Sequence, residues 1–343
     1  MISRDIIKAI SFYALRVLSF KMLLNFSAEK VIFPFYHHIS DRQPLHTKHL
    51  FKSISTEQFI KDLDFFLKYF TPASINDINN FSDNGKKSSK PLFLLSFDDG
   101  LSECFEIIAP ILKGKGIPAI FFINSAFVDN KTLFHKHKCS LLIEALHKTK
   151  DENKINHVHR ILNTNNSSFP KLSRQIRKLN YFDKDVINQI ANVFEIDFDL
   201  YLVKNKPYMS TTQIQQLLEM GFNIGGHSVD HPEFYLLNNE TMEKQVKECL
   251  LFLNEKFGII DHYFAFPFTD DQVPQSLFQN LNRQENINLS FGTAGLKKDM
   301  ETKHFQRIPM EIKKYNGAEE IIRSEYSYYF IKSFFGKNNL TRN

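Results

Sequence analysis

Two neighbouring carboxylates stand at the point where an apolar segment of the chain ends. Residues 92–97 read "LFLLSF", a run typical of a strand buried on both faces, and Asp98, Asp99 and Gly100 follow directly. Successive side chains of an extended chain point to opposite sides, so the two acids can divide their labour. One can bind a cation while the other accepts a proton from water. This pairing indicates metal-dependent hydrolysis.

A second group of polar residues follows another predicted strand. The segment "GGHSVDHP" places His227 and His231 four residues apart, directly after Gly225 and Gly226. Two imidazoles and one carboxylate form a common catalytic zinc set, which leaves one coordination position open. This spacing lets both imidazoles point the same way if residues 228–231 form one helical turn.

Strands and helices alternate along most of the chain, and this alternation must position the polar residues. Buried runs are predicted as strands, and capped, periodic segments as helices. The predicted strands are residues 92–97, "IPAIFFINSAF", a short strand before Gly225, "HYFAFPF" and "NLSFGTAG", and the predicted helices span about 102–113, 211–220, 240–257 and 316–336. The pattern predicts an α/β fold, either a doubly wound sheet or a (β/α) barrel. In both, loops at the carboxyl ends of the strands build the active site.

The domain organisation follows from two departures from this rhythm. Residues 1–26 are apolar overall but interrupted by five charges, so no uncharged run reaches the length of about 20 residues that spans a bilayer. We expect an amphipathic helix there, which either packs on the domain or lies in a membrane surface. Residues 31–343 are expected to form one domain, with a polar, helical insertion at about 131–206.

Composition excludes several classes of function. The net charge of +5, from 43 basic and 38 acidic residues, is modest, and no recognition motif for nucleic acid is present, so we exclude nucleic-acid binding. The three cysteines, Cys104, Cys139 and Cys249, are far apart and do not predict a disulfide framework. A reducing, cytoplasmic location is expected, with contact at the inner leaflet of a membrane if the N-terminal helix binds there.

The segments "SFDDG", "HSVDH" and "FAFPF" occur in this order and in this β/α context. They resemble the three leading motifs of the polysaccharide deacetylase family, which is carbohydrate esterase family 4 or the NodB homology domain; the usual forms are TFDDG, H(S/T)xxH and RxPY. The resemblance covers about residues 90–130 and 208–310, and "FYHHIS" is similar to the N-terminal extension of many bacterial members. It implies a distorted (β/α) barrel, a divalent metal, usually zinc, and removal of N-acetyl groups from amino sugars.

The resemblance also implies roles for residues of this chain. Asp98 would be the general base. The backbone N–H of Phe268, the aromatic residue after the proline of the third motif, would help to bind the oxyanion. The implied metal ligands are Asp99, His227 and His231.

The third motif departs from the family pattern, because Ala265 stands where the family often has an arginine that orients the base. Our hypothesis is that Arg307, in "KHFQRIPME", replaces this arginine, and that His37 or His304 protonates the leaving amine. Asp270 either lines the substrate groove or caps the following helix. The remaining histidines are expected to be structural or exposed.

The sequence therefore predicts a metal-dependent hydrolase that removes N-acetyl groups from an amino-sugar glycan or glycan precursor, for instance a lipid-linked sugar. One alternative is the same metal site acting on another amide or ester, since the pocket decides the substrate. The other is a catalytically silent carbohydrate-binding protein on this fold, a reading motivated by Ala265.

Overall fold

The computed structural model describes residues 18–27, 30–79, 90–164, 168–333 and 338–340, together with positions 8, 11, 13, 15 and 342. The predicted helix over residues 1–30 lies largely outside the described residues. Its described end is helix α2 (Phe20–Phe26), where the side chain of Ser19 accepts a hydrogen bond from the Met22 N–H. Within the described ranges, no helix is both long and apolar enough to cross a membrane.

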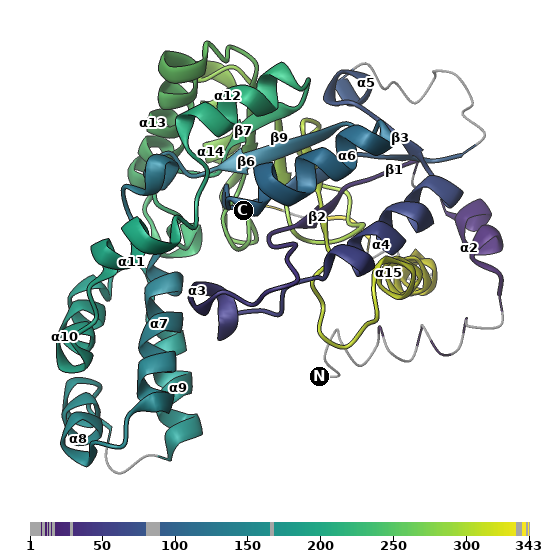
Figure 1. The fold of residues 1–343 in the computed structure, drawn as a ribbon. Helices are drawn as coiled ribbons and strands as arrows, with labels where there is room; N and C mark the ends of the chain where they lie inside the picture. The colour runs from purple at the N-terminus through teal and green to yellow at the C-terminus, as the bar shows by residue number, and fades with distance from the viewer. Residues whose placement is uncertain are drawn as a thin grey trace.

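The centre of the molecule is a curved sheet in which every neighbouring pair of strands is parallel (Figure 1). In spatial order its strands are β10 (His304–Gln306), β9 (Ile287–Gly292), β8 (His262–Ala265), β7 (Asn223–Gly226), β6 (Ala119–Ile123), β5 (Leu95–Phe97), β2 (Pro34–Tyr36) and β11 (Ile308–Pro309). The predicted α/β class is confirmed, and of the two architectures the barrel is the one observed.

The barrel closes through a single short stretch of chain. The two strands at the ends of the order, β10 and β11, are consecutive in sequence and separated only by Arg307. The first half pairs with β9 and the second half pairs with β2. Arg307 therefore stands at the point where the chain changes partner, and its N–H donates to the Gly292 carbonyl at 3.1 Å.

A small second sheet extends the barrel at one end. It consists of β1 (Val31–Ile32), β4 (Leu92–Phe93) and β3 (Thr71–Pro72), with β4 in the middle. The predicted strand over residues 92–97 is thus divided. Its first half pairs with β1 and β3, and its second half enters the barrel between β2 and β6.

Helices surround the barrel and connect its strands (Figure 1). Those packed around it are α3 (Leu45–Lys48), α4 (Thr56–Tyr69), α5 (Ile75–Asn79), α6 (Ala109–Lys115), α12 (Thr211–Glu219), α13 (Asn239–Phe257), α14 (Gln275–Gln284) and α15 (Ala318–Ser333). The sequence signals that predicted α12 and α13 are visible in the structure. Ser210 and Gln213 form a capping box at the start of α12, and Gly258, with φ of 67°, ends α13.

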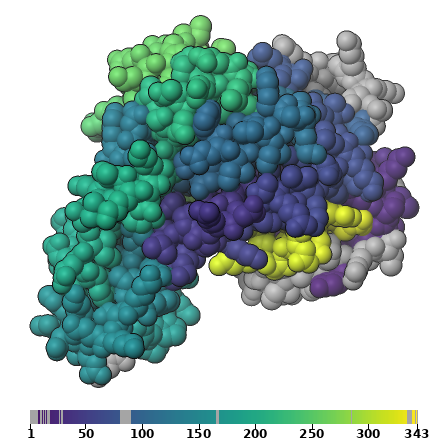
Figure 2. Space-filling model, in the orientation of Figure 1, coloured from purple at the N-terminus to yellow at the C-terminus, as the bar shows by residue number. Residues whose placement is uncertain are grey.

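Five further helices lie between β6 and α12: α7 (His135–Lys148), α8 (Glu152–Ile161), α9 (Phe169–Lys178), α10 (Lys184–Phe194) and α11 (Phe198–Asn205). We call α7 to α10 the arm, because they project from the barrel (Figures 1 and 2). The arm has its own apolar cluster, which includes Leu142, Leu172 and Ile190. Its base is α7, whose first residue lies beside the carboxyl ends of the strands.

Candidate metal centre and active site

The two acids of the first motif lie in a sharp turn after β5. Asp99 has φ of 71° and Gly100 has φ of 63°, so both adopt left-handed backbone, which glycine tolerates and aspartate adopts more readily than most residues. The expectation of an extended chain through both acids is therefore wrong at Asp99. Because of the turn, both carboxylates face one centre instead of opposite sides. His227 Nε2 lies 3.9 Å from Asp98 Oδ2 and 3.6 Å from Asp99 Oδ1.

The histidine loop starts at the end of β7, where close packing requires glycine. A Cβ atom at Gly225 would lie 2.5 Å from the ring of Phe122. Residues 228–231 do not form the helical turn that the spacing would allow, since Ser228 has φ of 71° and His231 has φ of 58°. The Ser228 hydroxyl instead accepts a hydrogen bond from the His231 N–H at 3.0 Å, and this bond holds the irregular loop.

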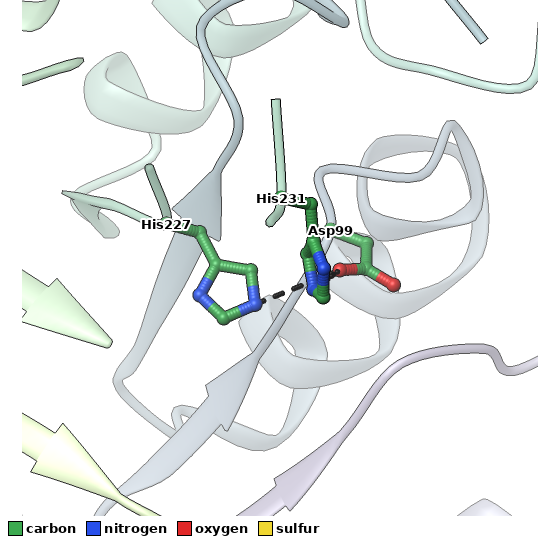
Figure 3. Close-up of side chains that lie close together, drawn as sticks. All are labelled: Asp99, His227 and His231. Carbon is green, nitrogen blue, oxygen red and sulfur yellow. Dashed lines mark ion pairs between the residues drawn. The ribbon is translucent and has the colours of Figure 1, made fainter. Parts of the chain in front are cut away.

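Asp99, His227 and His231 converge in a buried cluster (Figure 3). Their nearest ligand atoms all lie within 4.8 Å of one another. Asp99 Oδ1 is 3.2 Å from His231 Nε2 and 3.6 Å from His227 Nε2. Donors bound at 2.0–2.1 Å to a tetrahedral zinc ion would lie about 3.3 Å apart. The three side chains therefore fit a divalent cation.

The hydrogen bonds around this cluster also fit a cation. The Nδ1–H of His227 donates to the Ala265 carbonyl at 2.7 Å, which leaves the Nε2 lone pair directed at the cluster. Burial lowers the pKa of His227 to about 4 and keeps the imidazole in its neutral, ligand form. Asp99 Oδ1 is buried and receives no hydrogen bond from any described residue. A buried carboxylate oxygen that accepts no hydrogen bond is expected where a metal ion would be its partner.

Asp98 is held by Arg307. Nη1 and Nη2 of the guanidinium donate to Oδ1 and Oδ2 of Asp98 at 2.7 and 2.8 Å, and Nη1 also donates to Ser96 Oγ at 3.0 Å. The pair is deeply buried, with Arg307 0% and Asp98 2% exposed. Burial alone would raise the pKa of Asp98, but Arg307 and the neighbouring histidines outweigh it and hold the pKa below its usual value. Asp98 is therefore ionised.

Arg307 lies between β10 and β11, where the chain closes the barrel, and its side chain reaches Asp98 from there. Its guanidinium lies 4.3 Å from the ring centre of Phe35 and 5.3 Å from that of Phe122. This position gives Asp98 a bidentate arginine partner although Ala265 occupies the usual place of the family's arginine.

His37 follows β2 and is bound by Glu311, which follows β11. Glu311 accepts from the backbone N–H of His37 at 3.0 Å and contacts His37 Nδ1 at 2.5 Å, and it also accepts from the His38 N–H. Burial lowers the pKa of His37, but the Glu311 carboxylate and, to a smaller extent, Asp99 and Asp98 raise it to about 9. His37 is thus protonated at neutral pH and can donate a proton.

His304, the other candidate for the acid, lies elsewhere. Its Nε2 contacts Asp270 Oδ2 at 2.9 Å and its Nδ1 contacts Ser290 Oγ at 2.8 Å. Both ring nitrogens are therefore engaged, and the ring packs against Phe266 and Phe278. The structure does not bring His304 to the metal cluster.

Of the two hypotheses for Asp270, the helix cap is wrong and the substrate groove stays a prediction. Asp270 is 2% exposed, and its carboxylate binds His304, Gln306 and Arg342. The pocket that it borders, with Thr269 and Asp271, contains none of Asp99, His227 and His231. Helix α14 begins after Pro274 without a side-chain cap, so Asp270 does not cap it. Asp270 instead supports the loop of the third motif, because its Oδ1 accepts from the Thr293 N–H. Its neighbours Asp299 and His304 form a second acid–histidine group, which is neutralised by the Arg342 guanidinium.

Phe268 forms one wall of the site. It is 38% exposed, has φ of 56°, and its ring centre lies 4.6 Å from that of His231. No described residue accepts a hydrogen bond from its N–H, so this donor is available to a ligand. Phe134, at the base of the arm, lies 4.4 Å from His231 between ring centres and completes this wall.

Several residues at the site carried no sequence motif. Two of these residues, Glu233 and Tyr181, join the histidine loop to the arm. Glu233 in the loop forms an ion pair with Lys136 of the arm at 3.1 Å. The hydroxyl of Tyr181 in the arm donates a hydrogen bond to Asp230 of the loop at 2.9 Å. Asn124, at the end of β6, donates to the His227 carbonyl. The rule that polar residues at the carboxyl end of a strand face the site could have found Asn124. Nothing in the sequence places Glu233 or Tyr181 there.

Comparison with known proteins agrees with this geometry. The sequence profile of the polysaccharide deacetylase family matches residues 85–283. No curated protein sequence matches the chain. Among solved structures, the chain is similar to the deacetylase PplD of Streptococcus pyogenes in complex with acetate, with 12% identity, a TM-score of 0.55, and coverage of 87% of this chain and 99% of PplD.

A second similar structure is IcaB from Ammonifex degensii, with 14% identity, a TM-score of 0.54, and coverage of 88% of this chain and 98% of IcaB. At these identities the two structures support the fold: a mostly parallel barrel surrounded by helices. The family assignment comes from the profile, which spans more than half of the chain and includes the acid and histidine motifs. The protein belongs to the polysaccharide deacetylase family.

Proposed function

We propose that this protein removes N-acetyl groups from an amino-sugar glycan or glycan precursor by metal-dependent hydrolysis. The observation that carries the proposal is the ionised Asp98, held by Arg307 within 3.9 Å of a histidine of the metal cluster. A base and a set of metal ligands side by side serve hydrolysis, and a binding protein gains nothing from them. Family membership and the deacetylase PplD support the same reaction.

Asp99, His227 and His231 would hold the cation, most suitably zinc because the set is one carboxylate and two imidazoles. When bound, the cation would supply Lewis-acid polarisation of the acetyl carbonyl and activation of water. The protein's own residues then have three tasks: to take a proton from water, to stabilise charge on the carbonyl oxygen, and to give a proton to the leaving nitrogen.

Asp98 would perform the first task. Its two oxygens are fixed by Arg307, so the carboxylate stays ionised and oriented, and it accepts a proton as the water oxygen attacks the carbonyl carbon. The free N–H of Phe268 would donate to the oxygen on which negative charge develops. Phe268 and Phe134 exclude water from that side of the site and offer apolar rings to the sugar.

His37 would perform the third task. When the C–N bond breaks, the leaving amine nitrogen needs a proton, and His37 is held protonated by Glu311. Hydrolysis then balances: water adds to the acetyl carbon, one proton leaves through Asp98, and one proton reaches the amine through His37. Acetate and the free amino sugar are the products.

The place of action also remains a proposal. A cytoplasmic location, a lipid-linked sugar substrate and peripheral membrane contact through the N-terminal helix are the predictions of the sequence, and that helix lies largely outside the described residues.

The test is acetate release from N-acetylglucosamine oligomers by purified protein whose metal content has been measured. We expect about one equivalent of divalent metal, acetate release that stops when a chelator removes the metal, and loss of release in Asp98→Asn. His262→Gln serves as the matched control, because the His262 ring bonds the Glu285 carbonyl and its backbone N–H donates to Asn288, neither of which belongs to the site. Metal binding without acetate release would indicate a different amide or ester as substrate.

A further inference from the structure

Positive charge is concentrated in the insertion. Residues 131–206 contain 14 Lys and Arg against 8 Asp and Glu, an excess of six, whereas the whole chain has an excess of five. The rest of the protein is therefore close to neutral. The modest net charge of the chain conceals this asymmetry.

The charge is sharpest on helix α9 of the arm. Lys171, Arg174 and Lys178 are spaced three and four residues apart, so they share one helical face, and Arg177 lies beside them. All four side chains are exposed, whereas the opposite face of α9 is buried against α7. Residues 168–182 include no acid. We call Lys171, Arg174, Arg177 and Lys178 the basic face.

The basic face has no counter-charge within the described protein. None of its four residues forms an ion pair there, although lysines close by do: Lys154 pairs with Glu195 and Lys184 pairs with Asp230. Like charges at this spacing repel one another and disfavour the helix. A helix that keeps four such residues together is suited to a partner that carries negative charge.

The basic face leads to the active site. Helix α9 ends next to Leu179, whose carbonyl accepts a hydrogen bond from Lys136 Nζ at 2.6 Å. Lys136 Nζ in turn lies 5.8 Å from the ring centre of Phe268, the wall of the site. Figure 1 shows α9 in the arm beside α7. The contacts of Leu179 and Lys136 therefore connect the end of α9 to the place where the substrate is proposed to bind.

We propose that the basic face binds the negatively charged groups of an anionic glycan, one that carries carboxylate or phosphate groups along its chain. This inference rests on the proposed function and names its substrate class. One N-acetylated sugar occupies the site beside Phe268, while charged groups further along the same glycan contact Lys178, Arg174 and Lys171.

An anionic membrane would offer the same charges, but α9 is not built to enter one. Helices that bind in a membrane surface bury an apolar face among the lipids. The apolar face of α9, which includes Leu172 and Ile176, is already buried in the apolar cluster of the arm. Only the charged face of α9 is exposed to solvent. Its positive charges are complementary to those of a soluble polyanion lying along the helix.

The test compares two probes of similar size: a neutral oligomer of N-acetylglucosamine, and an oligomer that alternates N-acetylglucosamine with glucuronate. Their dissociation constants are measured for the wild type, for Lys171→Gln/Arg174→Gln/Lys178→Gln, and for the control Lys244→Gln/Lys247→Gln/Lys256→Gln. The control removes three exposed lysines from α13 on the barrel. Circular dichroism shows whether each variant keeps its fold.

We expect the wild type and the control to prefer the glucuronate oligomer, with affinity that falls as salt rises. In the α9 variant we expect the dissociation constant of this oligomer to rise about tenfold or more and the preference over the neutral oligomer to disappear. Equal affinities of wild type and α9 variant for the glucuronate oligomer would overturn the proposal. It would also be overturned if the α9 variant kept its glycan affinity but lost binding to phosphatidylglycerol vesicles.

Acetate release by the wild type from the neutral oligomer is measured separately. Its absence would contradict the proposed function, whereas the binding data decide the role of the basic face in either case.

Discussion

Removal of the Arg307 side chain should destabilise the protein severely, because it leaves a charge buried without a partner. Arg307 makes two charge-assisted hydrogen bonds to Asp98, one to Ser96 and a longer one to the Gly292 carbonyl, and it is fully buried. Breaking a buried ion pair by removing one partner costs about 3–5 kcal/mol. In Arg307→Met the methionine fills part of the space between the aromatic rings, so most of this cost comes from the unpaired carboxylate.

A double-mutant cycle separates the charge from the packing. Asp98→Asn leaves the Arg307 charge buried and turns an amide N–H₂ toward the guanidinium, so we expect a loss of similar size. In Asp98→Asn/Arg307→Met neither charge remains. Its loss should therefore be smaller than the sum of the two single losses by about 2 kcal/mol or more.

The assay is urea unfolding followed by far-ultraviolet circular dichroism, with metal removed by a chelator from all four proteins. Addition of zinc should then recover part of the loss in Arg307→Met, since a cation on Asp99 would offset the negative charge of Asp98 nearby. A loss below about 1 kcal/mol in Arg307→Met, or additive losses in the cycle, would refute the reasoning that the pair is a coupled, buried unit.

Three further predictions concern single side chains. Burial raises the pKa of Glu233, but His135 and Lys136 outweigh burial and lower this pKa to about 2. The ionised Glu233 side chain therefore stabilises the folded protein above pH 4.5, and this stabilisation is lost as the pH falls toward 2. Glu233→Gln should reduce the unfolding free energy by up to about 3 kcal/mol at pH 7 and change it little at pH 2. Burial lowers the pKa of His46 to about 4, so as the pH falls the unfolded chain binds a proton at His46 before the folded chain does. The unfolding free energy should therefore fall by about 3 kcal/mol as the pH is lowered from 6.5 to 4. This dependence on pH should be much weaker in His46→Leu. His37→Asn should lower kcat for acetate release about 100-fold or more with little change in KM, because it removes a proton donor and leaves the proposed metal ligands in place; an unchanged kcat would assign the proton to another group.

The sequence predicted the parts of this protein that depend on local signals. Helices α12 and α13 were found from Ser210, Gly221 and Gly258, because a cap or a left-handed glycine is a property of a few neighbouring residues. The grouping of Asp99 with His227 and His231 was predicted because polar residues after buried strands gather where parallel strands end. The strand and helix pattern alone did not separate the barrel from a doubly wound sheet, whereas the family resemblance correctly implied the barrel. That choice depends on β10 and β11 pairing with opposite ends of the sheet, a contact between distant residues.

The errors at the site have the same origin. Asp99, Ser228 and His231 all adopt left-handed backbone, and no propensity rule predicts this for three residues that are not glycine. The helix cap predicted at Asp270 was wrong because its partners His304 and Arg342 come from 34 and 72 residues further along the chain. The arm was identified as an insertion, but the contact of Glu233 with Lys136 and of Tyr181 with Asp230 could not be foreseen.

These arm contacts change what the insertion means for the site. Asp230 and Glu233 flank His231, so the loop that carries a proposed metal ligand is bound on one side to the arm and on the other to the barrel. The arm's own apolar cluster packs α7 to α10 into one unit. A glycan held on the basic face of α9 would therefore be held by the same packed unit that contacts the loop of His231 and has Phe134 at its base. Substrate position and metal geometry would then be set together, which explains why an insertion far from the three sequence motifs is packed so directly against them.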